Sequence, residues 1–146
     1  MELSGGQEHG DSAISEDRLR AVLDGVLQFE EEDDGALTVH HDHTFASLRV
    51  VTIAEGLDMV SLTQILVWDL PLDNELRDKV AQLAHDTLLG TVSLAEQVAG
   101  GGVADVTLRY NFPAAGLTDE ALRTMIVMVL STGADVRRAL VGDPGV

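Results

Sequence analysis

Near the start of the chain, apolar residues recur at the spacing of one α-helical face. They follow an i, i+3, i+4, i+7, i+8 pattern and are Leu19, Val22, Leu23, Val26 and Leu27. Ser15 stands in front of them as a candidate N-cap, and the acidic residues Glu16 and Asp17 suit the positive first turn of a helix. The pattern predicts a helix over about residues 16–28.

Three stretches with strand character come next, separated by turn residues. The acidic segment FEEEDDG at 29–35 indicates a solvated turn. We expect strands at 36–40, 45–53 and 59–70. In the third strand, alternation places five apolar residues on one face, namely Val60, Leu62, Leu66, Trp68 and Leu70.

A second helix and two further strands are predicted after the third strand. Pro71 cannot donate to a sheet ladder and therefore ends that strand. Asp73 caps a helix that Gly90 ends, and the apolar stripe of this helix consists of Leu76, Val80, Leu83, Ala84, Thr87 and Leu88. Strands are expected at 91–97 and 103–112, with a glycine-rich turn, VAGGG, between them. The inward positions of the last strand are Val106, Leu108, Tyr110 and Phe112.

The last predicted helix is apolar on more than one side. Thr118 caps it, and it runs to about Leu140. Its core stripe consists of Leu122, Met125, Ile126, Val129, Leu130, Gly133, Val136 and Leu140. Val127 and Met128 fall outside this stripe, and a helix with such a pattern is normally buried on two sides. Its second face therefore meets either a partner protein or another helix of the same domain.

These patterns identify three candidate partner-binding residues, which are Val127, Met128 and Trp68. Methionine adapts to interfaces of varied sequence. Trp68, the only tryptophan of the chain, is either such an anchor or a core residue, and the core interpretation is the simpler one. Gly133 lets the last helix approach a neighbour closely, or else it marks a kink.

The order of elements is α-β-β-β-α-β-β-α, and short turns join neighbouring strands. We therefore expect an α+β fold with an antiparallel five-stranded sheet packed with helices. The expected domain spans residues 14–140, with a mobile tail at 1–13 and a second tail at 141–146.

Charge and composition exclude several classes of function. The net charge of −16, with 9 Lys and Arg residues against 25 Asp and Glu, argues against nucleic acid and anionic membranes as partners. The longest apolar run, MIVMVL, is far shorter than the roughly 20 residues of a membrane helix. The N-terminus lacks the pattern of a signal peptide, so we expect a cytoplasmic protein. The absence of cysteine removes thiol chemistry.

The stretch VHHDHTF at 39–45 concentrates three of the five histidines. His40, His41 and His43 are the candidates for a metal site, which would need their ring nitrogens to converge, or two of them together with a distant carboxylate. The spacing is not one that metal geometry demands, and a polar hairpin tip is the favoured interpretation. A metal-dependent enzyme built on this cluster remains a remote alternative.

Other catalytic patterns are missing from the sequence. The run from Glu30 to Asp34 resembles a solvated acidic surface, not a tuned pair of carboxylates. Ser61 and Ser93 lack the G-x-S-x-G elbow, and the glycines at 100–102 lack the lysine of a phosphate-binding loop. The sequence thus predicts no catalytic, cofactor-binding or metal-binding residue and no enzyme activity.

Several motifs resemble the YbjN family, whose fold is that of the type III secretion chaperones. They are the opening helix SEDRLRAVLDGVL, the acidic turn EEEDDG, the segment LVWDLPLD, and above all the closing pair ADVTLRYNFPAAGLTDEALRTMIVMVL. The resemblance covers about residues 14–140. It departs from the family late in the middle helix, where Ala84, His85 and Asp86 stand in place of asparagines.

This resemblance implies a small acidic cytoplasmic protein, often dimeric, that binds other polypeptides and has no catalytic apparatus. The leading hypothesis is therefore a non-enzymatic, chaperone-like or adaptor domain, a homodimer, that holds or regulates a partner polypeptide. Exposed apolar patches and sheet edges would capture an extended segment of that partner. A sensory or regulatory module that responds to the state of the cell is the alternative.

Overall fold

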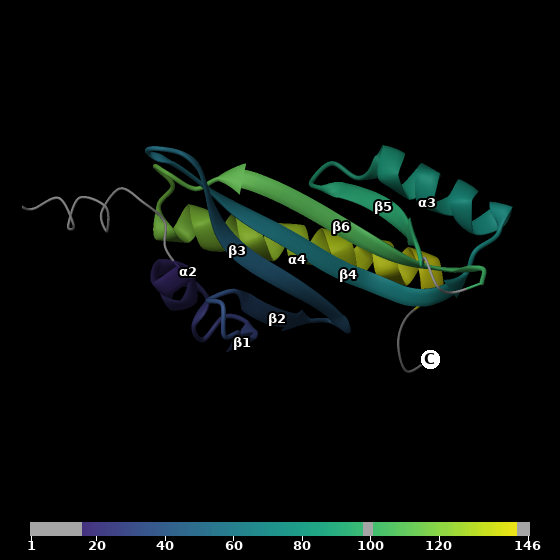
Figure 1. The fold of residues 1–146 in the computed structure, drawn as a ribbon, viewed down its shortest axis with the longest axis horizontal. Helices are drawn as coiled ribbons and strands as arrows, with labels where there is room; N and C mark the ends of the chain where they lie inside the picture. The colour runs from purple at the N-terminus through teal and green to yellow at the C-terminus, as the bar shows by residue number, and fades with distance from the viewer. Residues whose placement is uncertain (1–15, 98–100, 143–146) are drawn as a thin grey trace, which may run out of the picture.

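The computed structural model describes residues 16–97 and 101–142. Three helices occur in these ranges, namely α2 (Glu16–Leu23), α3 (Asn74–Asp86) and α4 (Asp119–Val141). Six strands accompany them: β1 (Gln28–Glu31), β2 (Leu37–His41), β3 (Thr44–Ala54), β4 (Leu57–Pro71), β5 (Thr91–Glu96) and β6 (Val103–Pro113). Figure 1 shows their arrangement.

All described strands belong to one antiparallel sheet with the order β1-β2-β3-β4-β6-β5. The predicted α+β class is confirmed, but the prediction of five strands is wrong. The additional strand is β1, which takes the last residue of the predicted first helix and the first three residues of the predicted acidic turn. Its residues pair with β2, Phe29 opposite Val39. Backbone hydrogen bonds do not depend on side-chain charge, and an edge strand tolerates acidic residues.

Two helices are shorter than the sequence pattern suggested. The first ends at Leu23, where Gly25 takes a positive φ of 79° and turns the chain into β1. The middle helix ends at Asp86, and Leu88, predicted to lie on its apolar stripe, is 92% exposed. In both places the end is decided by the need to reach the next strand, which an apolar spacing does not reveal.

The predicted N-caps Asp73 and Thr118 are confirmed, whereas Gly90 does not end the middle helix and Ser15 lies outside the described residues. The Asp73 carboxylate accepts a hydrogen bond from the Leu76 N–H at 2.8 Å, and the Thr118 hydroxyl accepts one from the Ala121 N–H at 3.0 Å. Each satisfies a backbone donor that the first turn of a helix leaves without an intrahelical acceptor. The closing helix then runs to Val141, one residue into the predicted C-terminal tail.

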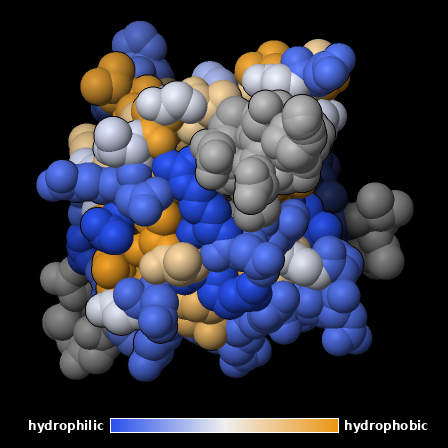
Figure 2. All heavy atoms as spheres, turned by 90° about the vertical axis from the view of Figure 1, so that its left-hand side faces the viewer, coloured by the Kyte–Doolittle hydropathy of each residue, from blue (hydrophilic) through white to orange (hydrophobic). Residues whose placement is uncertain are grey.

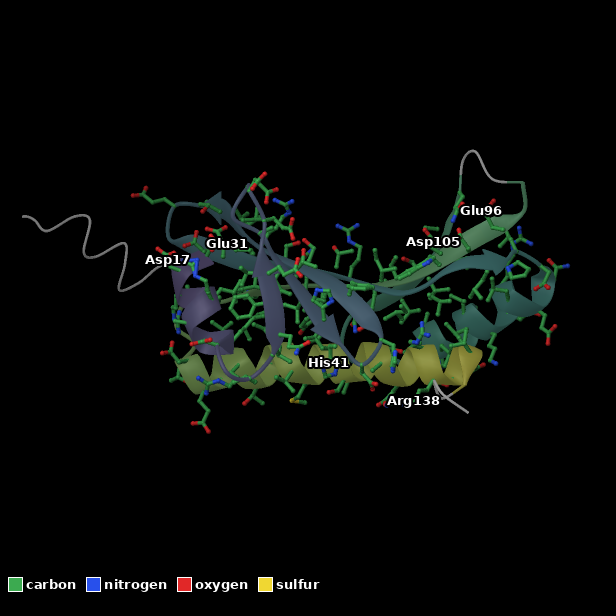
Figure 3. The ribbon with its side chains drawn as sticks, turned by 90° about the horizontal axis from the view of Figure 1, so that it is seen from below. Asp17, Glu31, His41, Glu96, Asp105 and Arg138 are labelled. Atoms are coloured by element: carbon green, nitrogen blue, oxygen red, sulfur yellow. The ribbon has the colours of Figure 1, made fainter. Side chains whose placement is uncertain are left out.

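The helices cover one face of the sheet. Helix α4 lies along its length, with α2 beside one end and α3 beside the other (Figures 1 and 3). Between them lies an aliphatic core with fully buried leucines from strands and helices, among them Leu23, Leu37, Leu48, Leu62, Leu108, Leu122 and Leu130. The inward positions predicted for the last strand are correct, since Val106, Leu108 and Phe112 are buried and Tyr110 packs against the core.

One polar side chain lies within this core. Gln64 on β4 is completely buried, and its amide donates hydrogen bonds to the Thr44 hydroxyl at 2.8 Å and to the Leu130 carbonyl at 3.1 Å. A Cβ atom at Gly133 of α4 would lie 2.0 Å from Gln64 Oε1. The close approach predicted for Gly133 is therefore confirmed, because any larger residue would overlap the glutamine amide.

The position of Trp68 differs from the simpler expectation. Strand β4 changes register against β6 between Ile65 and Val67, and again between Val67 and Leu70. Each irregularity alters which residues face the core, so that Val67 is buried whereas Trp68 is 48% exposed. The interpretation of Trp68 as a core residue is wrong.

Within residues 16–97 and 101–142, none of the helices is both long and apolar enough to cross a bilayer. The predicted tail at 1–13 and most of the predicted turn VAGGG lie outside the described residues, as do residues 143–146.

Candidate functional site

The sheet face opposite the helices, termed here the open face, carries two registered rows of side chains. The first row consists of Gln28, His40, Phe45, Ile65, Thr107 and Ser93. The second consists of Glu30, Thr38, Ser47, Thr63, Arg109 and Thr91. In Figure 3 the side chains of this face project away from α4. On the central strands β3 and β4 the first row is apolar and the second carries hydroxyl groups, so a ligand there would meet an apolar surface beside hydrogen-bond donors and acceptors.

Apolar side chains gather at the β3–β4 turn, which forms one end of the molecule. Val51 is 40% exposed, Ile53 61% and Leu57 40%. Figure 2 looks onto this end and shows a largely hydrophilic surface interrupted by hydrophobic patches. Strand β2 pairs only with residues 44–48 of β3, so no described strand covers that edge of β3 next to Val51 and Ile53.

Aromatic side chains gather toward the other end. The rings of His40 and Phe45 meet edge to face with centroids 4.8 Å apart, and Phe45 lies 5.9 Å from Trp68. A cavity of about 410 Å³ lies beside them, lined by His43, Phe45, Val67, Trp68 and Arg137. This set is termed the aromatic pocket.

Arg137 brings a positive charge from α4 to the aromatic pocket. Its Nη1 donates a hydrogen bond to the Leu66 carbonyl at 2.8 Å. Its Nε is buried and has no hydrogen-bond partner among the described residues. No carboxylate in the described ranges lies within 4.0 Å of it. The guanidinium therefore keeps donors that the described chain leaves unmatched.

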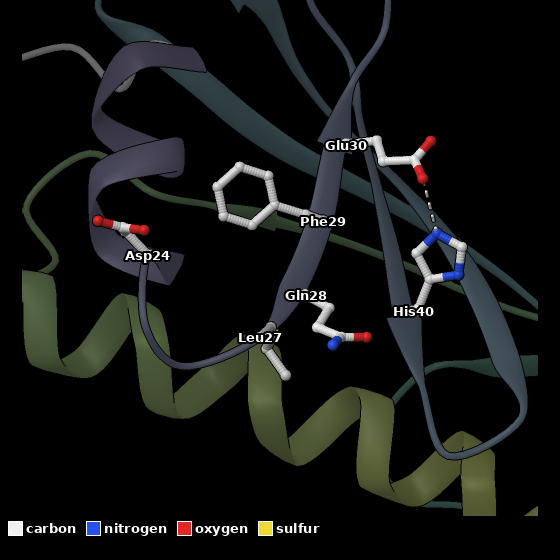
Figure 4. Close-up of a pocket in the computed structure, with 6 residues that line it drawn as sticks. All are labelled: Asp24, Leu27, Gln28, Phe29, Glu30 and His40. Atoms are coloured by element: carbon white, nitrogen blue, oxygen red, sulfur yellow. Dashed lines mark ion pairs between the residues drawn. The ribbon is translucent and has the colours of Figure 1, made fainter.

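The three clustered histidines lie at a hairpin tip, as predicted, and they diverge. Asp42 and His43 form a two-residue turn with positive φ values of 49° and 69°, which is typical of tight hairpins. His40 points to the open face, 3.7 Å from Glu30, while His41 alternates toward α4 and His43 lines the aromatic pocket (Figures 3 and 4). Within residues 16–97 and 101–142, no three His, Asp or Glu side chains are grouped to hold a metal ion.

An ion pair attaches this hairpin to α4. Arg138 contacts Asp42 at 2.6 Å and also pairs with Asp135. Hydrogen bonds to these two carboxylates, that of Asp42 being the stronger, raise the pKa of Arg138 above its ordinary value. The contact holds the β2–β3 turn beside the aromatic pocket.

The acidic turn between β1 and β2 is exposed and internally bonded. The Ala36 N–H donates to Asp34 at 3.1 Å and the Arg49 guanidinium donates to it at 2.7 Å. The hydrogen bond from Ala36 has the larger effect, and together with the one from Arg49 it holds the pKa of Asp34 below its ordinary value. The nearby hollow of about 540 Å³ is lined by Asp24 and Glu30, whose carboxylates point away from each other in Figure 4. They do not form an acid–base pair.

Comparisons with known proteins bear on the fold. No protein-family model and no curated protein matches the sequence. A solved structure does match, that of YbjN from E. coli, described as a candidate transcription regulator. It has a TM-score of 0.64 and 15% identity, and the match covers 84% of this chain and 88% of that one. The fold is YbjN-like. The predicted resemblance is confirmed at the level of the fold.

The predicted partner-binding residues lie on two separate surfaces of this YbjN-like domain. Met128 is 50% exposed and Val127 is half-buried, both on α4. Arg137, which faces the sheet, follows Met128 by nine residues, or two and a half helical turns, so Met128 lies on the opposite side of the helix. Trp68 lies beside Arg137. The three residues cannot form one site.

Sequence reasoning missed Phe45 and Arg137. A signal for Phe45 existed, because it occupies the outward phase of its strand while its neighbours Ala46 and Leu48 are buried. Arg137 could not be found in this way, because it lies 69 residues from Trp68 along the chain and only the packing of α4 brings the two together.

Proposed function

We propose that this domain is a non-enzymatic protein-binding module, chaperone-like or an adaptor, that holds or regulates a partner polypeptide on its open face. The observation that carries the proposal is the one-sided sheet, whose helices cover only one face. On the open face Phe45 and Ile65 are each 38% exposed, and at the β3–β4 turn Ile53 is 61% exposed. Antiparallel sheets often leave one face to water, but a purely solvated face has little use for exposed aromatic and branched residues.

An extended segment of the partner has two ways to bind. It can lie across the two registered rows of the open face, between the apolar tip and the aromatic pocket. It can also add as a strand to the free edge of β3. Strand β2 pairs only with residues 44–48, so no described strand pairs with residues 49–54 on the edge opposite β4. Strand addition provides main-chain hydrogen bonds, and neighbouring side-chain pockets provide the choice of partner.

Site-specific photocrosslinking tests the open face. A benzophenone amino acid at Ile65, in the middle of β4 and 38% exposed, is expected to crosslink one or a few discrete proteins in the native host. The same group at Ala81, exposed on α3, is the matched control and should not crosslink them. Identical products from the two positions, identified by mass spectrometry, would contradict the proposal.

The outer side of α4 supports a homodimer as a second element of the proposal. Met128 is flanked there by the exposed residues Ala121 and Thr124, and no charged residue occurs between Arg123 and Asp135. Small and apolar residues allow two helices to approach at 8–10 Å, roughly the usual interaxial distance.

The substitution Met128→Glu is expected to convert a dimer into a monomer, because it would place two carboxylates against each other across the two-fold axis. Size-exclusion chromatography with light scattering at micromolar concentration measures the mass. Ala81→Glu, which adds the same charge on α3, should remain dimeric. A monomeric unmodified chain, or a Met128→Glu variant that is still dimeric, would refute this element.

A regulatory module is the second candidate function, favoured by the description of YbjN as a candidate transcription regulator. With a net charge of −16, such regulation would act through a protein and not through the phosphates of DNA. The set of proteins crosslinked at Ile65 would then change between growth and stress, whereas a constitutive chaperone would keep the same client.

A further inference from the structure

We propose that the aromatic pocket binds an organic carboxylate, a molecule with a flat apolar body and one carboxylate group. The apolar walls of the pocket indicate the flat apolar body of the ligand. Phe45 and Trp68 present tilted rings with centroids 5.9 Å apart, and Val67 of β4 lines the pocket with them. A cavity of about 410 Å³ lies in the size range of small-molecule sites, which are largely apolar with a few placed polar groups.

Arg137 indicates the carboxylate group of the ligand. The Nη1 of Arg137 is bound to the Leu66 carbonyl. The other edge of the guanidinium, formed by Nε and Nη2, has no hydrogen-bond partner among the described residues, and Nε is buried. That edge is a fork of two parallel donors, which a carboxylate fits with both oxygens. A donor of this kind left unpaired in a partly buried place is costly, and a bound carboxylate would remove the cost.

The surroundings also favour an anion at this place in an otherwise acidic chain. His43 lines the pocket and can donate a hydrogen bond to a bound anion. Carboxylates on neighbouring segments already have partners. Asp42 pairs with Arg138, and Asp69 and Asp105 both accept hydrogen bonds from the Gln97 amide. None of them competes for Arg137.

The pocket contains its own reporter, because Trp68 is the only tryptophan of the chain. Titration with 3-phenylpropionate is expected to change Trp68 fluorescence with a Kd of about 0.1–1 mM, as befits a probe of this size. The uncharged 3-phenylpropanamide should bind at least about tenfold more weakly, and inorganic phosphate, which lacks the apolar body, should produce no change at the same concentrations.

Variants separate the pocket from non-specific binding. Arg137→Gln should weaken the binding of 3-phenylpropionate by about tenfold or more and leave the affinity for the amide unchanged. Arg109→Gln, which removes an exposed arginine from the open face, is the matched control and should bind like the unmodified chain. Phe45→Leu keeps an apolar side chain and should weaken the binding of both probes, the acid and its amide, to the same extent. Circular dichroism verifies the fold of each variant.

Two results would overturn the assignment. One is the absence of any fluorescence change, and of any heat by calorimetry, with 3-phenylpropionate up to 10 mM, roughly tenfold above the expected Kd. The other is equal affinity for the acid and its amide in the unmodified chain. Because these probes contain no protein, the outcome is independent of whether the open face holds a polypeptide.

The same chemistry can come from a free metabolite or from the C-terminal carboxylate of a peptide that ends in phenylalanine. N-acetyl-Gly-Gly-Phe distinguishes them. Tighter binding of this peptide than of 3-phenylpropionate assigns the pocket to a chain terminus, and binding of the small acid alone assigns it to a metabolite. Both results require the Arg137 dependence described above, and both support the site.

Discussion

Leu62→Ala is expected to lower the free energy of unfolding by about 2–5 kcal/mol, the usual cost of emptying a buried leucine site. Leu62 is completely buried in the middle of β4, in register with Leu48 on β3 and Tyr110 on β6. Strands on both sides hold the backbone in place, so the cavity cannot collapse. Urea unfolding followed by circular dichroism measures the change.

Thr63→Ala is the matched control, because the next residue of the same strand points to the open face. It is half-buried, and its loss should cost less than about 1 kcal/mol, the span of strand propensities. A comparable loss in both variants would mean that this face is packed as tightly as the other, and the one-sided sheet on which the proposed function rests would be refuted.

Gly133→Ala is expected to destabilise the protein by about 1–3 kcal/mol, the range for overpacked cores. The direction is opposite to that of helix propensity, which favours alanine over glycine by about 1 kcal/mol in a helix interior. Packing wins because the added carbon would lie 2.0 Å from Oε1 of Gln64, and moving this buried amide would break its hydrogen bonds to Thr44 and Leu130.

A double-mutant cycle identifies the cause. In a Gln64→Ala background the overlap is gone, so Gly133→Ala should become neutral or stabilising by up to about 1 kcal/mol. Thermal and urea unfolding of the four proteins provide the coupling energy. An equal effect of Gly133→Ala in both backgrounds would show that the glutamine is not the residue that requires glycine on α4.

The two proposed binding functions share one residue. Phe45 belongs to the first row of the open face and also forms a wall of the aromatic pocket. A carboxylate bound beside Trp68 would therefore contact the same ring that a polypeptide on the open face would contact. A regulatory module of this design would couple ligand and partner through direct competition or shared packing, without any change in the fold.

Local patterns along the chain predicted much of the architecture. The apolar stripe from Leu122 to Leu140 and the Thr118 cap placed α4 within one residue of its observed end. Strict alternation identified the inward side of β6, and the polar stretch after Val39 predicted the hairpin tip. These features depend on residues within a few positions of one another, so the sequence contains them directly.

Contacts between distant segments decided the rest. The strand at Gln28–Glu31 exists because β2 pairs with it, and Trp68 is exposed because β4 changes register against β6. The three histidines diverge because a turn with two positive φ values lies within them. The sequence by itself determined the helices, the main strands and the acidic charge, since these follow from periodicity and composition. Only the tertiary structure decided the uncovered face and the meeting of Arg137 with Trp68, because pairing, bulges and helix packing join residues that have no local relation.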